Sequence, residues 1–146
     1  MNLDIGCGRN KKEGYMGIDI AKDSSADILA SVVIMPIRNN IISEISCRHL
    51  VEHLYPEEAQ RLFDEIYRVL KEGGVADLKI DRDWSAHRLL NKDPTHKHRY
   101  SRKELVGMLD NFEVKRVRNV IYRFGFNIRK KIVVHLEKGN NVGWHS

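Results

Sequence analysis

The sequence predicts an α/β fold with a mostly parallel sheet and an antiparallel pair of strands at its C-terminal end. Short apolar runs surround one amphipathic helix in the first 80 residues, an order that is typical of a parallel core. Two more apolar runs follow near the C-terminus and suit an antiparallel pair. The chain has 146 residues and shows no repeat, low-complexity tract or linker. A single domain over residues 1–146 is therefore expected.

Four short strands are expected before the first helix. The first stops at Gly6, and Pro36 ends the third because proline cannot donate a hydrogen bond to a sheet. The fourth carries an alternation of apolar and polar side chains. These strands are placed at residues 2–5, 15–20, within 26–34 and at 41–47.

A helix is predicted to begin at Pro56, since proline is tolerated in the first turn of a helix. Gly73-Gly74 is expected to end this helix, and a fifth strand follows at residues 75–80. Ser101 and Glu104 form a capping-box pattern for a second helix that runs to about residue 110. The last strands are expected at 112–117 and 132–137. The apolar face of the first helix consists of Leu62, Phe63, Ile66, Val69 and Leu70.

Charge is unevenly distributed along the chain. Residues 1–80 contain 10 Lys and Arg against 13 Asp and Glu, a balance of −3, and residues 81–146 contain 15 against 7, a balance of +8. A basic half of this kind is more often a solvated face, and the sharper interpretation is contact with an anionic substrate such as RNA or a phosphorylated metabolite.

Composition places the protein among globular, cytoplasmic proteins. Hydrophobic residues make up 42% of the chain and charged residues 31%. No apolar run approaches the roughly 20 residues that span a bilayer, and no signal-peptide pattern is present, so no membrane association is expected. Cys7 and Cys47 lack a C-x-x-C spacing, and reduced thiols in the cytoplasm are the default expectation.

A glycine turn and an aspartate predict a nucleoside-bearing cofactor. Gly6 and Gly8 stand at the tip of the first strand, where missing side chains let a ligand approach the backbone. Asp19 ends the second strand and is placed to accept hydrogen bonds from two ribose hydroxyls. A dinucleotide is less favoured, because the G-x-G-x-x-G pattern would need glycine in place of Lys11. Asp4 lies within an apolar strand, so its carboxylate needs a partner such as a cationic amino group.

Four motifs in order carry a family resemblance. "LDIGCG" followed by "GIDI" resembles the first two motifs of the class I S-adenosylmethionine-dependent methyltransferases. "SEISCRHLVEHL", "RVLKEGGVADLKI" and "THKHRYSRKEL" are similar to later segments of one large subgroup, the type 11-like enzymes. The resemblance covers about the first 105 residues. It implies a Rossmann-like sheet, S-adenosyl-L-methionine as cofactor and methyl transfer as the reaction.

The resemblance also implies a role for individual residues. Asp19 would take the ribose, and Cys7 would touch the cofactor through its backbone. The acid that the family usually carries near the third strand falls on Ser31, so a serine hydroxyl or a backbone amide would have to recognise adenine. The methionine portion would be held by Asp4, Gly6 and Gly8, with Cys47 and Arg48 alongside.

The chain looks like a minimal version of this fold, similar to a short predicted subgroup of methyltransferases. Residues 9–14 replace the usual helix after the glycine turn, and the helix before the first strand is not expected. Apolar sheet surface near Leu3, Ile5 and Ile18 should then face solvent, apart from what the tail around Trp144 covers. This reasoning predicts a homodimer or a complex with a partner protein.

Two histidine clusters are candidates for chemistry. His49 to His53 spells H-x-x-E-H, which is also an inverted zinc-protease signature. Its position between a strand and a helix argues against that activity, and no metal ligand is predicted. As a weaker alternative, Glu52 and His53 bind a divalent cation that holds an oxygen-rich acceptor. If the acceptor must lose a proton, His53, or His96 and His98 in the loop with Arg99 and Tyr100, could act as base.

The sequence thus predicts a methyltransferase that acts on a small-molecule or RNA acceptor. Two alternatives stay open. One is a catalytically inactive relative that keeps the fold and binds a partner, and the other is a basic RNA-binding module without a cofactor.

Overall fold

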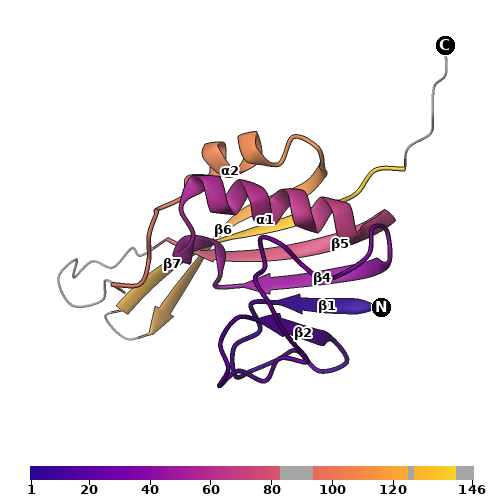
Figure 1. The fold of residues 1–146 in the computed structure, drawn as a ribbon. Helices are drawn as coiled ribbons and strands as arrows, with labels where there is room; N and C mark the ends of the chain where they lie inside the picture. Colours follow the sequence, from indigo (N-terminus) through magenta and orange to yellow (C-terminus); the bar gives the residue numbers. More distant parts are fainter. Residues whose placement is uncertain (83–93, 125–126, 141–146) are drawn as a thin grey trace, which may run out of the picture.

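The computed structural model describes residues 1–82, 94–124 and 127–140. Their strands form one sheet of seven, which is covered by two α-helices (Figure 1). The elements in chain order are β1 (Asn2–Ile5), β2 (Met16–Asp19), β3 (Ile28–Leu29), β4 (Ile42–Arg48), η1 (Val51–His53), α1 (Pro56–Val69), β5 (Leu70–Asp81), α2 (Arg102–Met108), β6 (Glu113–Phe124) and β7 (Asn127–Glu137).

The sheet has the order β3-β2-β1-β4-β5-β7-β6 and confirms the predicted fold class. The first five strands are parallel, and β7 pairs antiparallel with both β5 and β6. In the register, Ile5 lies opposite Ile18 on one side and Cys47 on the other. Parallel pairing brings the carboxyl ends of β1, β2, β4 and β5 to one edge, where ligands of open α/β sheets bind.

α1 begins as predicted and ends earlier than predicted. Pro56 stands in its first turn, with Glu57 and Glu58 at the positive end of the helix dipole. The helix ends at Val69, and β5 begins at the next residue, so the prediction that Gly73-Gly74 ends the helix was wrong. The two glycines lie inside β5, and Gly73 has a φ of +72° beside a shift in the pairing with β4. The glycines therefore bend a strand.

α2 confirms the predicted capping box. The Ser101 hydroxyl accepts a hydrogen bond from the backbone N–H of Glu104 at 3.1 Å. α2 lies against α1, because the Gln60 side chain donates to the Met108 carbonyl at 3.2 Å. Both helices therefore cover the same face of the sheet.

The register gathers the apolar strand residues on the face beneath these helices. Leu3, Ile5 and Ile18 are each 0% exposed and belong to one core cluster. The exposed apolar surface that was expected around these three residues is therefore absent, and that expectation was wrong. Their row continues across the sheet through Ile45, Cys47, Ala76, Leu78, Ile80, Ile132, Val134 and Leu136.

The segment between β3 and β4 helps to close this core. Met35 and Ile37 are 4% and 8% exposed and join the same cluster. The Arg68 guanidinium donates to the carbonyls of both residues, at 3.0 and 2.7 Å, and the Glu65 carboxylate accepts from the Met35 N–H at 2.7 Å. These contacts hold the irregular segment against α1. The apolar side chains of the segment then cover core surface that would otherwise face water.

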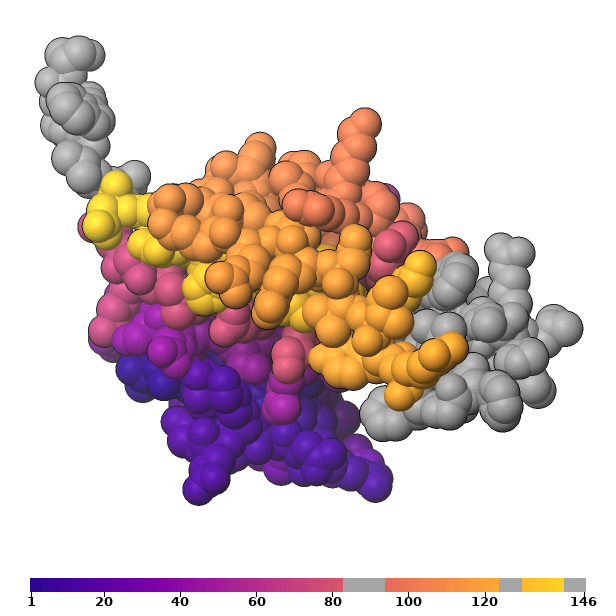
Figure 2. Space-filling view, turned by 180° about the vertical axis from the view of Figure 1, so that it is seen from behind, coloured from indigo at the N-terminus to yellow at the C-terminus, as the bar shows by residue number. Residues whose placement is uncertain are grey.

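The opposite face of the sheet is polar. Within the described ranges no helix covers it, and the view from behind shows the C-terminal residues above the N-terminal ones (Figure 2). Asp77 and His135 pair across β5 and β7 at 2.5 Å, and the Tyr15 hydroxyl donates to Glu44 at 2.6 Å. In the described part of the chain, this uncovered face therefore exposes charged side chains instead of apolar ones.

Neither described helix could span a bilayer: the longer, α1, has 14 residues and an amphipathic sequence. The tail around Trp144 lies outside the described residues.

Candidate functional site

Two cavities open at the carboxyl edge of the sheet and share Gly6. The larger has a volume of about 790 Å³ and the smaller about 230 Å³. The turn that follows β1 and residues of β4, β5, β6 and β7 line the larger cavity. The smaller cavity is lined from the end of β2, the segment after β3 and α1. A long ligand with two different ends could therefore lie across Gly6.

The two glycines at the tip of β1 differ in what they permit. Gly6 has a φ of +63°, and a Cβ there would lie 2.9 Å from a methyl carbon of Leu50. Gly8 has a φ of +56°, and a Cβ there would meet no atom within 4 Å. Both need glycine for the left-handed backbone. Gly6 also lacks room for a side chain, while Gly8 leaves its backbone open to the cavity.

Asp19 fastens the glycine turn to the end of β2. One carboxylate oxygen accepts the N–H of Gly8 and the other the N–H of Ala21, each at 2.8 Å. The side chain also lines the smaller cavity. Each carboxylate oxygen can accept a further hydrogen bond, so Asp19 can hold the turn and two ligand hydroxyls together.

Asp4 is buried and only partly satisfied. It is 1% exposed on the polar face of β1. Its Oδ2 accepts the Lys12 N–H at 2.7 Å and lies 3.2 Å from Arg48 Nη2. Its Oδ1 has no hydrogen-bond partner among the described residues. A buried carboxylate oxygen without a donor fits the cationic amino group that the sequence analysis assigned to Asp4.

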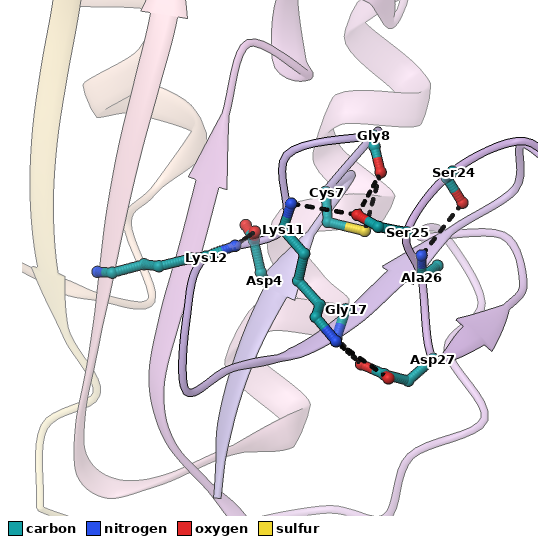
Figure 3. A network of polar contacts seen from close by, with 10 residues as sticks. All are labelled: Asp4, Cys7, Gly8, Lys11, Lys12, Gly17, Ser24, Ser25, Ala26 and Asp27. Atoms are coloured by element: carbon teal, nitrogen blue, oxygen red, sulfur yellow. Dashed lines mark hydrogen bonds and ion pairs between the residues drawn. The ribbon is translucent and has the colours of Figure 1, made fainter.

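The loop that replaces the usual helix is held by polar contacts (Figure 3). Lys11 Nζ lies 2.8 Å from an Asp27 carboxylate oxygen, which also accepts the N–H of Gly17 at 2.8 Å. The Ser25 hydroxyl donates to the Gly8 carbonyl at 3.0 Å and accepts the Lys11 N–H at 3.2 Å. The glycine turn is thus positioned by side chains instead of a helix.

The two thiols lie in different places. Cys7 is 7% exposed and lines the larger cavity, whereas Cys47 is 0% exposed, faces the core and lines neither cavity. Burial, followed by the nearby Asp19 and Asp4 carboxylates, raises the pKa of Cys7. Burial is also the largest cause of the raised pKa of Cys47, with Glu52 and Asp4 adding to it. Both thiols are therefore neutral at physiological pH.

Ser31 lies in the smaller cavity with a second polar residue that the sequence analysis did not identify. Its hydroxyl accepts the Val33 N–H at 3.4 Å. Glu58 of α1 lines the same cavity, and one of its oxygens accepts the Tyr55 N–H at 3.2 Å. A carboxylate is thus present in this cavity, although it comes from α1 and not from the third strand.

The three predicted bases do not line either cavity. His53 contacts Thr95 and packs against His96, with ring centroids 4.7 Å apart. His98 Nε2 lies 2.8 Å from a Glu104 oxygen, at the start of α2. Tyr100, from the same loop, is 0% exposed and donates its hydroxyl to the Leu54 carbonyl at 2.6 Å, with a pKa raised mainly by burial.

The larger cavity contains cationic residues that the sequence analysis missed. Arg48, which was predicted, is joined there by Arg9, Lys79 and Lys131, and His49 and Tyr122 also contribute. Lys79 could have been found, because it stands near the carboxyl end of a parallel strand. Lys131 and Tyr122 could not, because only the placement of β7 next to β5, and of β6 next to β7, brings them to this edge.

Comparisons with known proteins agree with this geometry. A family model described as a methyltransferase domain matches residues 3–76, half of the chain. No curated protein sequence matches significantly.

Solved structures share the fold. A SAM-dependent methyltransferase from Methanosarcina mazei is similar with a TM-score of 0.74 and 20% identity, over 94% of this chain and 92% of that one. One from Archaeoglobus fulgidus has a TM-score of 0.70 and 20% identity, over 91% and 85%. Geranyl diphosphate C-methyltransferase from Streptomyces coelicolor, solved with Mg²⁺, geranyl diphosphate and S-adenosyl-L-homocysteine, has a TM-score of 0.69 and 11% identity, over 94% and 72%.

These structural likenesses show the shared fold, and the match to the family model shows the family. The chain therefore belongs to the class I methyltransferases, enzymes that use S-adenosyl-L-methionine as cofactor.

Proposed function

We propose that the protein transfers the methyl group of S-adenosyl-L-methionine to an anionic acceptor, either RNA or a phosphorylated small molecule. The observation that carries this proposal is the charge of the larger cavity, whose lining includes Arg9, Arg48, Lys79 and Lys131. Four cations around one cavity attract phosphate groups and raise their local concentration.

The cofactor would lie across the two cavities. Asp4 Oδ1, which has no partner in the described part of the chain, suits its amino group. The open space at Gly8 suits close approach of its methionine portion. Gly6, the Cys7 backbone and Arg48 would border the same portion, and Cys47 would contribute through its backbone alone. Asp19 would hold the ribose. Adenine would enter the smaller cavity, next to Ser31 and Glu58.

The bound cofactor supplies an electrophilic methyl group on a sulfonium. The protein then has to position the acceptor and exclude water, and these effects supply most of the acceleration. A base is needed only for an acceptor O–H or N–H. His53 and His96 adjoin Glu52, which lies 3.7 Å from the cavity-lining His49, so we retain these two as candidate bases. His98 is engaged by Glu104.

Two measurements test the proposal. Calorimetry with S-adenosyl-L-homocysteine should show binding by the wild type and weaker binding by Asp19→Asn. Asp77→Asn, a substitution on the polar face away from both cavities, is the matched control and should bind as the wild type does.

Labelled methyl transfer to cell extract then tests the acceptor. We expect label in RNA, where ribonuclease releases it, or in small anionic molecules that an anion exchanger retains. Label only in uncharged products would overturn the acceptor class. Cofactor binding without any transfer would favour a catalytically inactive relative.

A further inference from the structure

Glu52 is a buried carboxyl group without a hydrogen-bond donor among the described residues. It lies in η1, directly after β4, and is 1% exposed. Neither of its oxygens has a hydrogen-bond partner in the parts of the chain that the structure describes. An ionised carboxylate is strongly disfavoured away from water unless a cation or a donor compensates it. A cation is therefore expected beside Glu52.

Two groups of side chains that could bind a metal ion share this carboxylate. Glu52, His53 and His96 each offer a ligand atom, and these atoms all lie within 4.8 Å of one another. The same holds for His49, Glu52 and Asp81. His49 Nδ1 is 3.7 Å from Glu52 Oε1, which is longer than a hydrogen bond. Because a carboxylate has two oxygens, Glu52 can face both groups.

The first group has the orienting contact that metal-binding histidines usually have. His53 Nδ1 lies 3.2 Å from the Thr95 carbonyl oxygen and 3.0 Å from its hydroxyl. When Nδ1 donates its proton to the carbonyl, Nε2 keeps its lone pair, the state in which imidazole binds a metal. The ring also packs edge-on against His96, with an interplanar angle of 84°.

We propose that Glu52, His53 and His96 bind a divalent transition-metal ion. His49 Nε2 accepts from Lys131 Nζ at 3.1 Å, which leaves the proton on Nδ1 facing Glu52, so His49 lies beside the site and is not one of its ligands. Two imidazoles with one carboxylate suit Zn²⁺, Fe²⁺ or Co²⁺, whereas Mg²⁺ prefers oxygen ligands and water. The sequence analysis predicted no metal ligand and kept a divalent cation at Glu52 and His53 as a weaker alternative. The structure adds His96, because only the fold brings it to the H-x-x-E-H motif.

The position suggests a use for the ion. Glu52 lies 3.7 Å from His49, which lines the larger cavity, so the ion would be held next to that cavity and an acceptor oxygen there could become a further ligand. This use rests on the proposed function, but metal binding itself does not. With the ion bound, His53 and His96 are ligands and no longer candidate bases.

Binding can be measured without any assay of activity. The protein is stripped with a chelator and titrated with Co²⁺, whose visible absorption reports its ligands, and then with Zn²⁺ and Mg²⁺ by calorimetry. We expect one equivalent of Co²⁺ that Zn²⁺ displaces, and much weaker binding of Mg²⁺. Glu52→Gln and His96→Gln should each bind Co²⁺ at least about 10-fold more weakly. His135→Gln, on the polar face, is the control and should bind as the wild type does.

A thermal melt separates loss of the site from loss of the fold. In chelator, Glu52→Gln should melt no lower than the wild type, because it removes a buried charge. In Zn²⁺ the wild type should gain stability and Glu52→Gln should not. Equal Co²⁺ affinity in the wild type and Glu52→Gln, or no Co²⁺ binding by the wild type, would overturn the proposal. Binding of S-adenosyl-L-homocysteine is also measured in chelator, which distinguishes the two proposals. If the wild type binds S-adenosyl-L-homocysteine but not Co²⁺, the metal site alone is overturned.

Discussion

At the scale of single residues, Asp4 is the most direct test of how the cofactor is held. Asp4→Asn keeps the shape of the side chain and the Lys12 and Arg48 contacts on one oxygen, but it removes the negative charge. Hydrogen bonds to a charged group contribute roughly 1.5–3 kcal/mol. We therefore expect S-adenosyl-L-homocysteine to bind about 10- to 150-fold more weakly in calorimetry.

Asp77→Asn again serves as the control for Asp4→Asn, because Asp77 lies on the same face of the sheet but two strands away, where it pairs with His135 and not with the loop after β1. Unchanged affinity in Asp4→Asn would remove Asp4 from the proposed site.

The Cys47 thiol predicts how stability depends on pH. A thiol in the unfolded chain ionises near pH 8.5, but burial raises the pKa of folded Cys47 well above that. Above about pH 8.5 the unfolded state therefore holds fewer protons than the folded state, so the free energy of unfolding falls as pH rises. The slope for this single thiol approaches about 1.4 kcal/mol per pH unit.

Urea denaturation at pH 8 to 10 under reducing conditions measures this slope. In Cys47→Ala the free energy of unfolding should fall less steeply with pH, because the contribution of this one thiol is removed. This difference in slope is expected whatever the substitution does to stability at pH 8. Identical slopes in the two proteins would mean that the folded thiol ionises normally.

The positions of candidate site residues could be predicted where neighbouring segments alone define the geometry. Asp4, Gly6, Gly8 and Asp19 end two strands that pair directly, so a motif a few residues long places them. The side of the sheet that Cys47 faces was beyond such reasoning, because it depends on the register of β4 against both of its neighbours.

At the scale of elements, the loop at residues 9–14 takes the place of the helix that usually follows the glycine turn in this family. The Lys11 side chain passes over Gly17 to reach Asp27, and a Cβ at Gly17 would lie 2.7 Å from Lys11 Cδ and 2.8 Å from Cys7 Sγ. Gly17→Ala should therefore overpack this point and lower the free energy of unfolding by about 1–2 kcal/mol.

Gly107→Ala is a matched substitution for Gly17→Ala. Gly107 lies in α2, and a Cβ there meets no atom within 4 Å. Replacing a helical glycine in open space should raise stability by about 0.5–1 kcal/mol. Chemical denaturation of both variants is the measurement, and equal effects would show that Lys11 simply moves aside.

The end of α1 shows why the boundary between two elements was missed. Val69 and Leu70 continue the apolar face of a helix, so the sequence pattern gives no stop before the glycines. The stop comes from pairing, because Leu70 lies opposite Ile42 in the sheet. A partner that is distant in the sequence thus overrides the local helical period.

At the scale of the whole molecule, the helices on one face of the sheet determine which side chains the other face exposes. The sequence analysis expected apolar strands without a cover. The structure instead places the apolar side chains under α1 and α2 and leaves pairs such as Asp77 and His135 on the open face. A homodimer formed through this face would bury charged side chains, so the reason for predicting one is removed.

The open face also carries exposed cations that continue from the larger cavity. Arg116 lies opposite His135 and Arg118 opposite Val133, and both arginines are exposed on β6. If the acceptor is RNA, its backbone would follow these arginines toward the cavity. The association constant should then fall with salt, through release of counterions, by about 0.7 in log–log slope for each phosphate contacted on a single strand.

Charge reversal at these arginines tests the path that RNA would take. Arg116→Glu with Arg118→Glu should weaken binding of a tRNA fragment and make the salt slope shallower by about 1.4. The same variant should bind S-adenosyl-L-homocysteine normally, because neither arginine lines the two cavities at the carboxyl edge.

Arg102→Glu with Lys103→Glu changes the net charge equally, but these exposed residues lie on α2, over the other face. Filter binding between 50 and 300 mM salt, on the order of physiological ionic strength, compares the two variants. Equal losses of RNA affinity in the two variants would show that binding depends only on net charge. A loss of affinity confined to the variant with both β6 arginines replaced would place the RNA on the open face of the sheet.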